Sequence, residues 1–171
     1  GCQGCPRLRA YCARIALDKR AASRDEIYWG RPVPGFGDRR ARLLVLGLAP
    51  GAHGANRTGR PFTGDGSANS LMRALHAAGF ANMPTSRHLR DGLKLADAYI
   101  SSVVRCAPPD NRPLQVEITN CHEHLKAEAA ALPSIRVVVA LGRVAFDSYW
   151  RLIADRGATV KPRPKFQHGL V

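Results

Sequence analysis

Acidic residues are scarce in this sequence, and long apolar runs are missing. The 171 residues include 13 Asp and Glu against 26 Lys and Arg, which leaves a formal net charge of +13 at pH 7. This excess favours a polyanionic partner, nucleic acid before an acidic membrane surface. No apolar segment approaches the ~20 residues of a membrane-spanning helix, and no signal sequence begins the chain. We therefore expect a cytoplasmic protein that binds nucleic acid and does not enter a membrane.

Two common catalytic loops are also missing. No Gly-Lys-Ser/Thr follows the glycine-rich stretch, which excludes a phosphate-binding Walker loop there, and no Gly-x-Ser-x-Gly offers a serine nucleophile. Internal repeats and low-complexity tracts are absent as well. With 45% hydrophobic residues, the sequence predicts one globular domain over residues 1–171.

Three apolar runs predict the strands of one sheet. They cover residues 42–48, 98–105 and 136–141, and helical periodicity follows each of them, at about 67–79, 116–132 and 143–155. This alternation predicts an α/β fold, a three-layer α/β/α domain with a mostly parallel central sheet. A further helix is expected from Pro6, and the turn-rich stretch 25–40 is expected to lack regular structure.

A long glycine-rich loop, residues 47–66, follows the first predicted strand. Ligands of parallel sheets bind beyond the carboxyl ends of the strands, and a loop this long is costly unless it binds something. The loop carries one aromatic ring, Phe62, and one carboxylate, Asp65, among glycines that let the backbone approach a ligand. These residues suit hydrolysis at a carbon that bears a base, with the ring stacked on the base and the carboxylate activating a water.

Structural explanations exist for the same side chains. Phe62 would fit a core position, and His53 would hydrogen-bond the loop backbone. Asp65 would cap the helix that begins near Ser67, a role that is compatible with catalysis.

Four of the five cysteines form two groups, Cys2 with Cys5 and Cys106 with Cys121. Four thiols in a chain with no export signal predict a metal or cluster site, and both zinc and a [4Fe-4S] cluster accept four sulfur ligands. Zinc sites more often use two tight C-x2-C pairs, so the wide second gap favours the [4Fe-4S] cluster. Unrelated buried cysteines are the remaining alternative, and Cys12 fits a buried position on an apolar helix face.

Two histidines flank Glu123 next to Cys121. His122 and His124 would be able to join a metal site, but their place on a polar helix predicts that they face solvent.

Three motifs resemble a known family. The run GLAPGAHGANRTGRPFTGD at 47–65, the C-x2-C start and VVRCAPPDNRP with a later cysteine are similar to the iron-sulfur uracil-DNA glycosylases of family five (type b). The resemblance covers nearly the whole chain. It implies a monofunctional, monomeric DNA repair enzyme that hydrolyses the N-glycosidic bond of uracil and other deaminated bases in DNA and leaves an abasic site. A non-catalytic iron-sulfur nucleic-acid-binding or sensor protein on the same scaffold is the alternative.

The resemblance also implies roles for single residues. Asp65 would activate the water, Phe62 would stack on the flipped base, and the four grouped cysteines would hold the cluster. The residues implied to bind the base are Gly47, Ala49, Pro50, Gly51, His53, Asn56, Phe62 and Ser102. Family four has Glu where Leu48 stands and Asn where Ser102 stands, so we expect a pocket that accepts more than uracil.

One motif of the family is not found in the sequence. The family carries His-Pro-Ser on a loop after a fourth strand, and His168 precedes that place. The sequence also starts at Gly1 without a methionine and ends just after a basic, proline-containing stretch, so we expect that the chain is truncated at both ends and lacks this motif.

Overall fold

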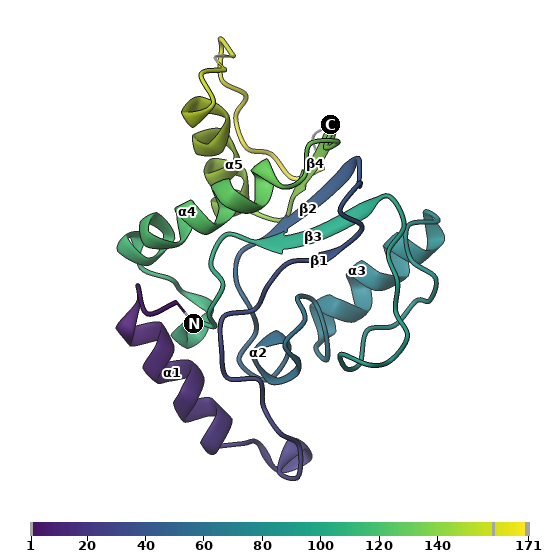
Figure 1. Ribbon diagram of the computed structural model, residues 1–171, viewed down its shortest axis with the longest axis vertical. Helices are drawn as coiled ribbons and strands as arrows, with labels where there is room; N and C mark the ends of the chain where they lie inside the picture. Colours follow the sequence, from purple (N-terminus) through teal and green to yellow (C-terminus); the bar gives the residue numbers. More distant parts are fainter. Residues whose placement is uncertain (1, 159, 170–171) are drawn as a thin grey trace.

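A computed structural model describes residues 2–158 and 160–169 (Figure 1). Its sheet has the strand order β1-β3-β2-β4. The strands are β1 (Phe36–Gly37), β2 (Leu43–Gly47), β3 (Ala98–Ser102) and β4 (Val137–Ala140). β2 is parallel to both β3 and β4, whereas β1 runs antiparallel to β3. The α/β class and the mostly parallel sheet are confirmed.

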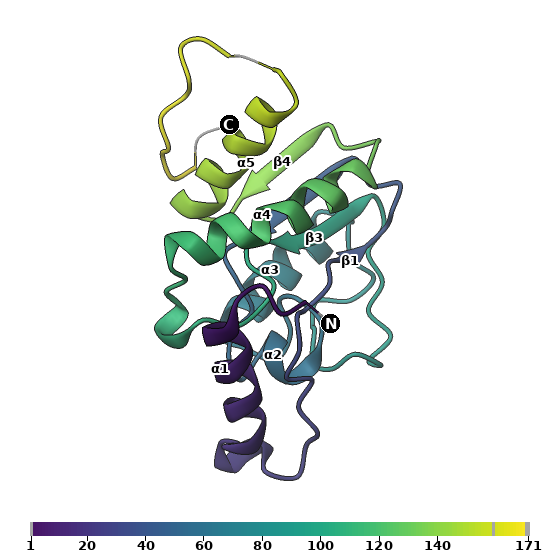
Figure 2. The ribbon, with the colours of Figure 1, turned by 60° about the vertical axis from the view of Figure 1, so that its left-hand side comes forward.

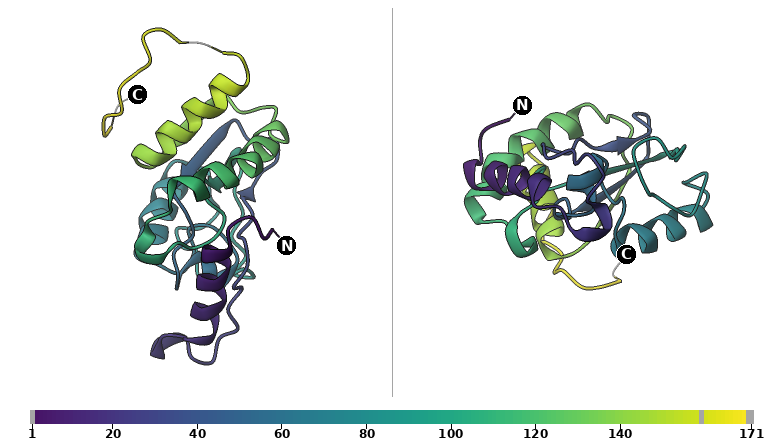
Figure 3. Two further views of the ribbon diagram at one scale, coloured as in Figure 1. Left: turned by 90° about the vertical axis from the view of Figure 1, so that its left-hand side faces the viewer. Right: turned by 90° about the horizontal axis from the view of Figure 1, so that it is seen from below.

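Helices cover both faces of this sheet. They are α1 (Pro6–Leu17), α2 (Ala55–Thr58), α3 (Gly66–Ala77), α4 (Gln115–Ala130) and α5 (Arg143–Asp155), with 3-10 turns at Ala21–Ser23 and Pro109–Asn111. α3 lies on one face, and α4 and α5 lie on the other (Figure 1, Figure 3). α1 extends from the end of the molecule opposite α5 (Figure 2). The three-layer arrangement is the one that the alternating sequence pattern predicts.

The apolar run of β2 supplies both faces of the sheet at once. Val45 packs in the cluster beneath α3, with Met72 and Ile100. Its neighbour Leu46 points the other way, into the cluster formed with α1, α4 and α5. Because successive side chains of a strand alternate between faces, a central strand buried on both sides needs a continuous apolar run.

β4 is different because it is an edge strand of the described sheet, next to the central strand β2. Val137 is 55% exposed and Val139 is 41% exposed. They share a face with Val45, which pairs with Val139, while Val138 and Ala140 pack toward the α5 side. The apolar run at 136–141 thus predicts the strand, but one of its two faces is exposed.

Three predictions about local structure were wrong. The stretch 25–40 contains β1, because Phe36 pairs with Ile100 along the free edge of β3. The glycine-rich loop contains the single turn of α2, which is followed by the C-cap residue Gly59 with a φ of +80°. His122 is buried rather than solvent-facing, because α5 packs on α4 and Asp155 Oδ2 lies 2.7 Å from its Nε2.

No helix within residues 2–158 and 160–169 combines the length and the apolar character needed to cross a membrane.

Candidate functional site

A cleft of about 1060 Å³ opens at the carboxyl ends of β2 and β3. Its largest wall is the first part of the glycine-rich loop, residues 47–55, and a second wall comes from the rest of that loop and the start of α3, within residues 61–71. Tyr11 from α1 and Leu141 after β4 contribute to its rim. Of the residues implied for catalysis and base binding, the cleft is lined by Gly47, Ala49, Pro50, Gly51, His53, Phe62, Asp65 and Ser102. All of the implied residues except Asn56 therefore line the cleft, and their roles there stay predictions.

The Phe62 ring packs against Gly47, and the Phe62 backbone has an unusual conformation. A Cβ atom on Gly47 would lie only 2.8 Å from two carbons of the Phe62 ring, so the ring lies directly on the end of β2. The φ of Phe62 is +49°, a left-handed conformation that is rare for an aromatic residue and typical of functional sites. The ring also packs against the cluster beneath α3. Phe62 is thus both a partial core residue and a wall of the cleft.

Asp65 uses its two carboxylate oxygens differently. Oδ1 caps α3, because it accepts the Ala68 N–H at 2.9 Å and the Ser67 hydroxyl at 2.7 Å. Oδ2 faces the glycine loop: a Cβ atom would lie 3.0 Å from it at Gly51 and closer still at Gly54. The two glycines therefore let the carboxylate come close to the loop backbone. The cap fixes the side chain and leaves Oδ2 available at the cleft.

His53 is oriented by Tyr28, a residue that sequence reasoning did not connect with the site. The Tyr28 hydroxyl lies 3.0 Å from His53 Nδ1 and has no other hydrogen-bond partner among the described residues. Tyr28 is 7% exposed, and its hydroxyl is satisfied when it donates to Nδ1, the tautomer that carries the ring proton on Nε2. Burial lowers the pKa of His53, and so do Arg20 and Arg57. The ring is therefore neutral at pH 7 and offers the cleft one N–H donor.

Asn56 lies beneath the loop and does not line the cleft. It is fully buried, and its amide group donates to the carbonyl oxygens of Ala52 at 3.3 Å and Cys12 at 3.5 Å. In the next position, Arg57 donates to the His53 carbonyl at 2.8 Å and pairs with Glu26. Both residues hold the loop, and the base-binding role of Asn56 stays a prediction.

A buried ion pair fixes the second wall of the cleft. Arg60 is 2% exposed, and its guanidinium donates to both oxygens of Asp91, at 2.9 and 2.6 Å. It also donates to Thr63 Oγ1 at 3.0 Å and to Ser86 Oγ at 2.9 Å. Burial raises the pKa of Asp91, but the bonds from Arg60 and three backbone N–H groups outweigh it and hold that pKa well below its usual range. This Arg60 clamp ties the segment around Phe62 and Asp65 to residues 86–93.

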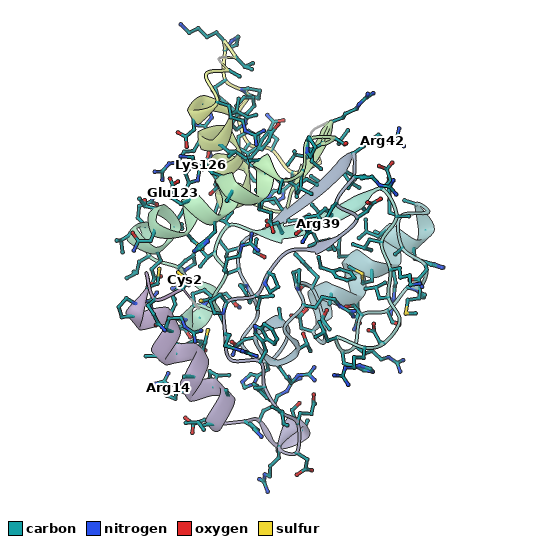
Figure 4. All side chains as sticks on the ribbon, in the orientation of Figure 1. Cys2, Arg14, Arg39, Arg42, Glu123 and Lys126 are labelled. Atoms are coloured by element: carbon teal, nitrogen blue, oxygen red, sulfur yellow. The ribbon has the colours of Figure 1, made fainter. Side chains whose placement is uncertain are left out.

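The four grouped cysteines surround one small hollow between the start of α1 and α4. Cys2, Cys5, Cys106 and Cys121 all line it, and all are free thiols. Figure 4 shows Cys2 at this place with other sulfur atoms near it. Within the described part of the chain, no three metal-binding side chains converge closely enough to hold a single ion.

N–H groups point at the sulfur atoms of this hollow. The backbone N–H of Gly4 donates to Cys2 Sγ at 3.4 Å, and that of Arg105 donates to Cys121 Sγ at 3.3 Å. The neighbouring Cys12 and Arg9 lower the pKa of Cys106, whereas burial raises the pKa of Cys121 to about 11. Four thiols with N–H donors around them are a suitable donor set for an iron-sulfur cluster. Cys12 is fully buried in the core, as its place on the apolar helix face predicts.

Comparison with known proteins shows which family the chain is similar to. The model of the uracil DNA glycosylase superfamily matches residues 34–169. A Type-5 uracil-DNA glycosylase of Mycobacterium bovis is 50% identical over 171 residues, which are 99% of this chain and 63% of that protein. The Type-5 uracil-DNA glycosylase of Thermus thermophilus is 49% identical, over 98% of this chain and 74% of that protein. A Type-4 uracil-DNA glycosylase of Archaeoglobus fulgidus is 33% identical over 70% of this chain and 53% of that protein. The chain thus spans less than two thirds of the M. bovis relative.

The Arg60 clamp can be tested by replacing Asp91 with Asn. We expect the free energy of unfolding to fall by about 3 kcal/mol, because loss of one partner leaves an uncompensated buried charge. Chemical denaturation measures this change. Asp97→Asn is the matched control, since its pair with Arg42 is largely exposed and should cost less. Equal losses in the two variants would show that Arg60 is not held as described.

Proposed function

The chain belongs to the uracil DNA glycosylase superfamily and to its type-5 group, and from this premise we propose that it hydrolyses the N-glycosidic bond of uracil and other deaminated bases in DNA, leaving an abasic site. The observation that carries the proposal is the cleft in which Phe62 and Asp65 meet the glycine loop. The net charge of +13 supports DNA as the partner.

The chemistry follows from what the two side chains offer. The base, flipped out of the stack, lies on Phe62, which brings the sugar carbon C1′ toward Asp65. As the bond from C1′ to the base nitrogen breaks, its electron pair leaves with the base and positive charge builds on the sugar. Asp65 stabilises that charge and takes a proton from the water that attacks C1′. Because water is the nucleophile, the strand stays intact and the enzyme is monofunctional.

Selection among bases is proposed to begin at His53. Deaminated bases carry a carbonyl oxygen where their parents carry an amino group, and a neutral N–H donor favours the carbonyl. Leu48 and Ser102 line the same cleft with an apolar and a short side chain. Neither offers the paired donor and acceptor of an amide, which supports a pocket that accepts uracil and larger deaminated bases such as hypoxanthine.

A [4Fe-4S] cluster is the cofactor we propose for the cysteine hollow, with Cys2, Cys5, Cys106 and Cys121 as its ligands. Bound there, it would act as a cross-link that joins the start of the chain to the segment between β3 and α4. Iron-sulfur ligation requires thiolates, which the reducing cytoplasm preserves. We therefore propose that the protein works in the cytoplasm, and that it does so as a monomer.

Replacing Asp65 with Asn tests the proposed reaction. Asn still caps a helix, so α3 should persist while the carboxylate charge is lost. We expect the release of free uracil from a labelled duplex to slow by about a hundredfold to ten-thousandfold. Full activity of Asp65→Asn would show that Asp65 is not the base, and no release by the unaltered protein would favour the non-catalytic alternative.

A second test moves the carboxylate without changing it. The methyl group of Gly54→Ala would clash with Asp65 Oδ2 and displace it. We expect uracil release to fall by about a hundredfold, because a shift of about 1 Å in a reacting group has this effect. Gly66→Ala is the control, since nothing lies within 4 Å of its Cβ position. If both variants keep the normal rate, the close approach of Asp65 to the loop is irrelevant to the reaction.

The cofactor proposal is tested by metal analysis. We expect the purified protein to be brown, with visible charge-transfer absorption and about four irons per chain. Cys121→Ser should lose the colour and Cys12→Ala should keep it, because only the first thiol lines the hollow. A colourless preparation that holds one zinc would overturn the proposal.

A further inference from the structure

A second groove lies beside the cleft and is rich in arginine. It has a volume of about 700 Å³, and we call it the arginine groove after four of its lining residues, Arg20, Arg57, Arg73 and Arg87. Asn69 and Thr85 also line it. The cleft and the arginine groove adjoin each other, because Arg20 and Asp65 line both of them.

Three of the four arginines form no ion pair with any described residue. Arg57 pairs with Glu26 and holds the glycine loop, so its role is structural. Arg20, Arg73 and Arg87 are exposed, and none of them forms an ion pair with a described residue. Among the residues that the structure describes, Asp65 is the one carboxylate in the wall of the groove. The groove thus concentrates positive charge next to the candidate catalytic acid.

The arginines of the groove come from well-fixed backbone. Arg73 projects from α3, whose start is capped by Asp65. Arg87 lies in the segment held by the Arg60 clamp: its N–H donates to Asp91 Oδ2 at 2.7 Å, and Gly64 N–H donates to the Ser86 carbonyl at 3.0 Å. The two walls of the groove are therefore tied to each other and to the segment that carries Phe62 and Asp65. Such fixed positions lower the entropic cost of binding a ligand.

We propose that the arginine groove holds the phosphodiester backbone of the strand that contains the extruded nucleotide, on one side of that nucleotide. This inference rests on the proposed function: with the base on Phe62 and the sugar at Asp65, the chain of phosphates continues from the point where cleft and groove meet. Guanidinium groups bind phosphate oxygens through paired hydrogen bonds, and such contacts fix position without reading sequence. Arg73 and Arg87 should therefore govern affinity for DNA, and not the choice of base.

The salt dependence of binding tests this assignment. Arg73→Gln, Arg87→Gln and the double variant are prepared in the Asp65→Asn protein, so that the uracil-containing duplex is not consumed. Affinity for DNA falls as salt rises, and removing one arginine that neutralises a phosphate should make the plot of log affinity against log salt less steep by about 1. We expect a reduction of about 1 for each single variant and about 2 for the double variant. Circular dichroism melting confirms that each variant is folded.

Arg136→Gln is the matched control. Arg136 is also exposed, but its N–H donates to the Arg42 carbonyl, at the amino ends of the strands, and Figure 4 shows Arg42 there, far from α1. The substitution also removes one positive charge, but it does so at the amino ends of the strands, whereas the cleft lies at their carboxyl ends. We expect its slope to equal that of the parent protein.

DNA duplexes in which one phosphate at a time is uncharged show more closely where the uracil-containing strand lies. Duplexes with a single methylphosphonate at each position near the uracil should show one or two positions, all on one side, where binding weakens. In the double variant these positions should have no effect, because the arginines that sense the charge are gone.

The outcomes separate the two proposals. Unchanged slopes in the double variant, or an equal reduction in Arg136→Gln, would overturn the arginine groove while leaving base release to be judged by its own assay. If the unaltered protein releases no base but shows the arginine-dependent slope and the one-sided methylphosphonate pattern, the groove is supported as a DNA contact and the proposed reaction fails.

Discussion

The buried ion pair between Arg60 and Asp91 is the interaction on which the candidate site depends. The Arg60 guanidinium is 2% exposed, and the cost of burying its charge is offset by the hydrogen bonds that it donates to Asp91, Thr63 and Ser86. Those partners lie on both sides of α3 in the sequence, so the pair joins segments that the chain itself separates. The strained backbone of Phe62 lies between Arg60 and Thr63, where this network can hold its left-handed conformation. Cleft and arginine groove thus share one buried support.

Glycine acts at this site as a steric requirement more than as a source of flexibility. Gly47 makes room for the Phe62 ring, and Gly54 makes room for the Asp65 carboxylate. A side chain at either position would overlap with one of the two groups on which the proposed chemistry rests. The loop is well ordered by contacts of its own, since Arg57 and Asn56 bond to its carbonyl groups. Its backbone is therefore a fixed surface on which ring and acid are placed.

The sequence predicted those features that depend on residues close to one another in the chain. Apolar runs and helical periodicity located β2, β3, β4 and the helices that follow them, because burial on a regular element leaves a periodic pattern. The glycine-rich loop with its aromatic ring and its acid indicated where the cleft lies, and the paired cysteines indicated where the cysteine hollow lies.

Features that depend on distant partners left no such pattern. β1 is two residues long and exists only because β3 has a free edge. Burial of His122 is decided by α5, and the role of Tyr28 by a contact with His53. Arg60 looks like any surface arginine until its partner Asp91 is folded against it. Such contacts lie between elements, and periodicity within one element cannot reveal them.

Helix α1 extends from the cysteine hollow to the cleft. Cys5 stands just before its first turn and lines the cysteine hollow, whereas Tyr11 lines the rim of the cleft. At 1.5 Å per residue, about 9 Å of stiff rod separates the two positions. Because fewer than two helical turns separate them, the thiol end of α1 and the wall of the cleft belong to one rigid element, and the thiol end is a fixed reference for the position of Tyr11.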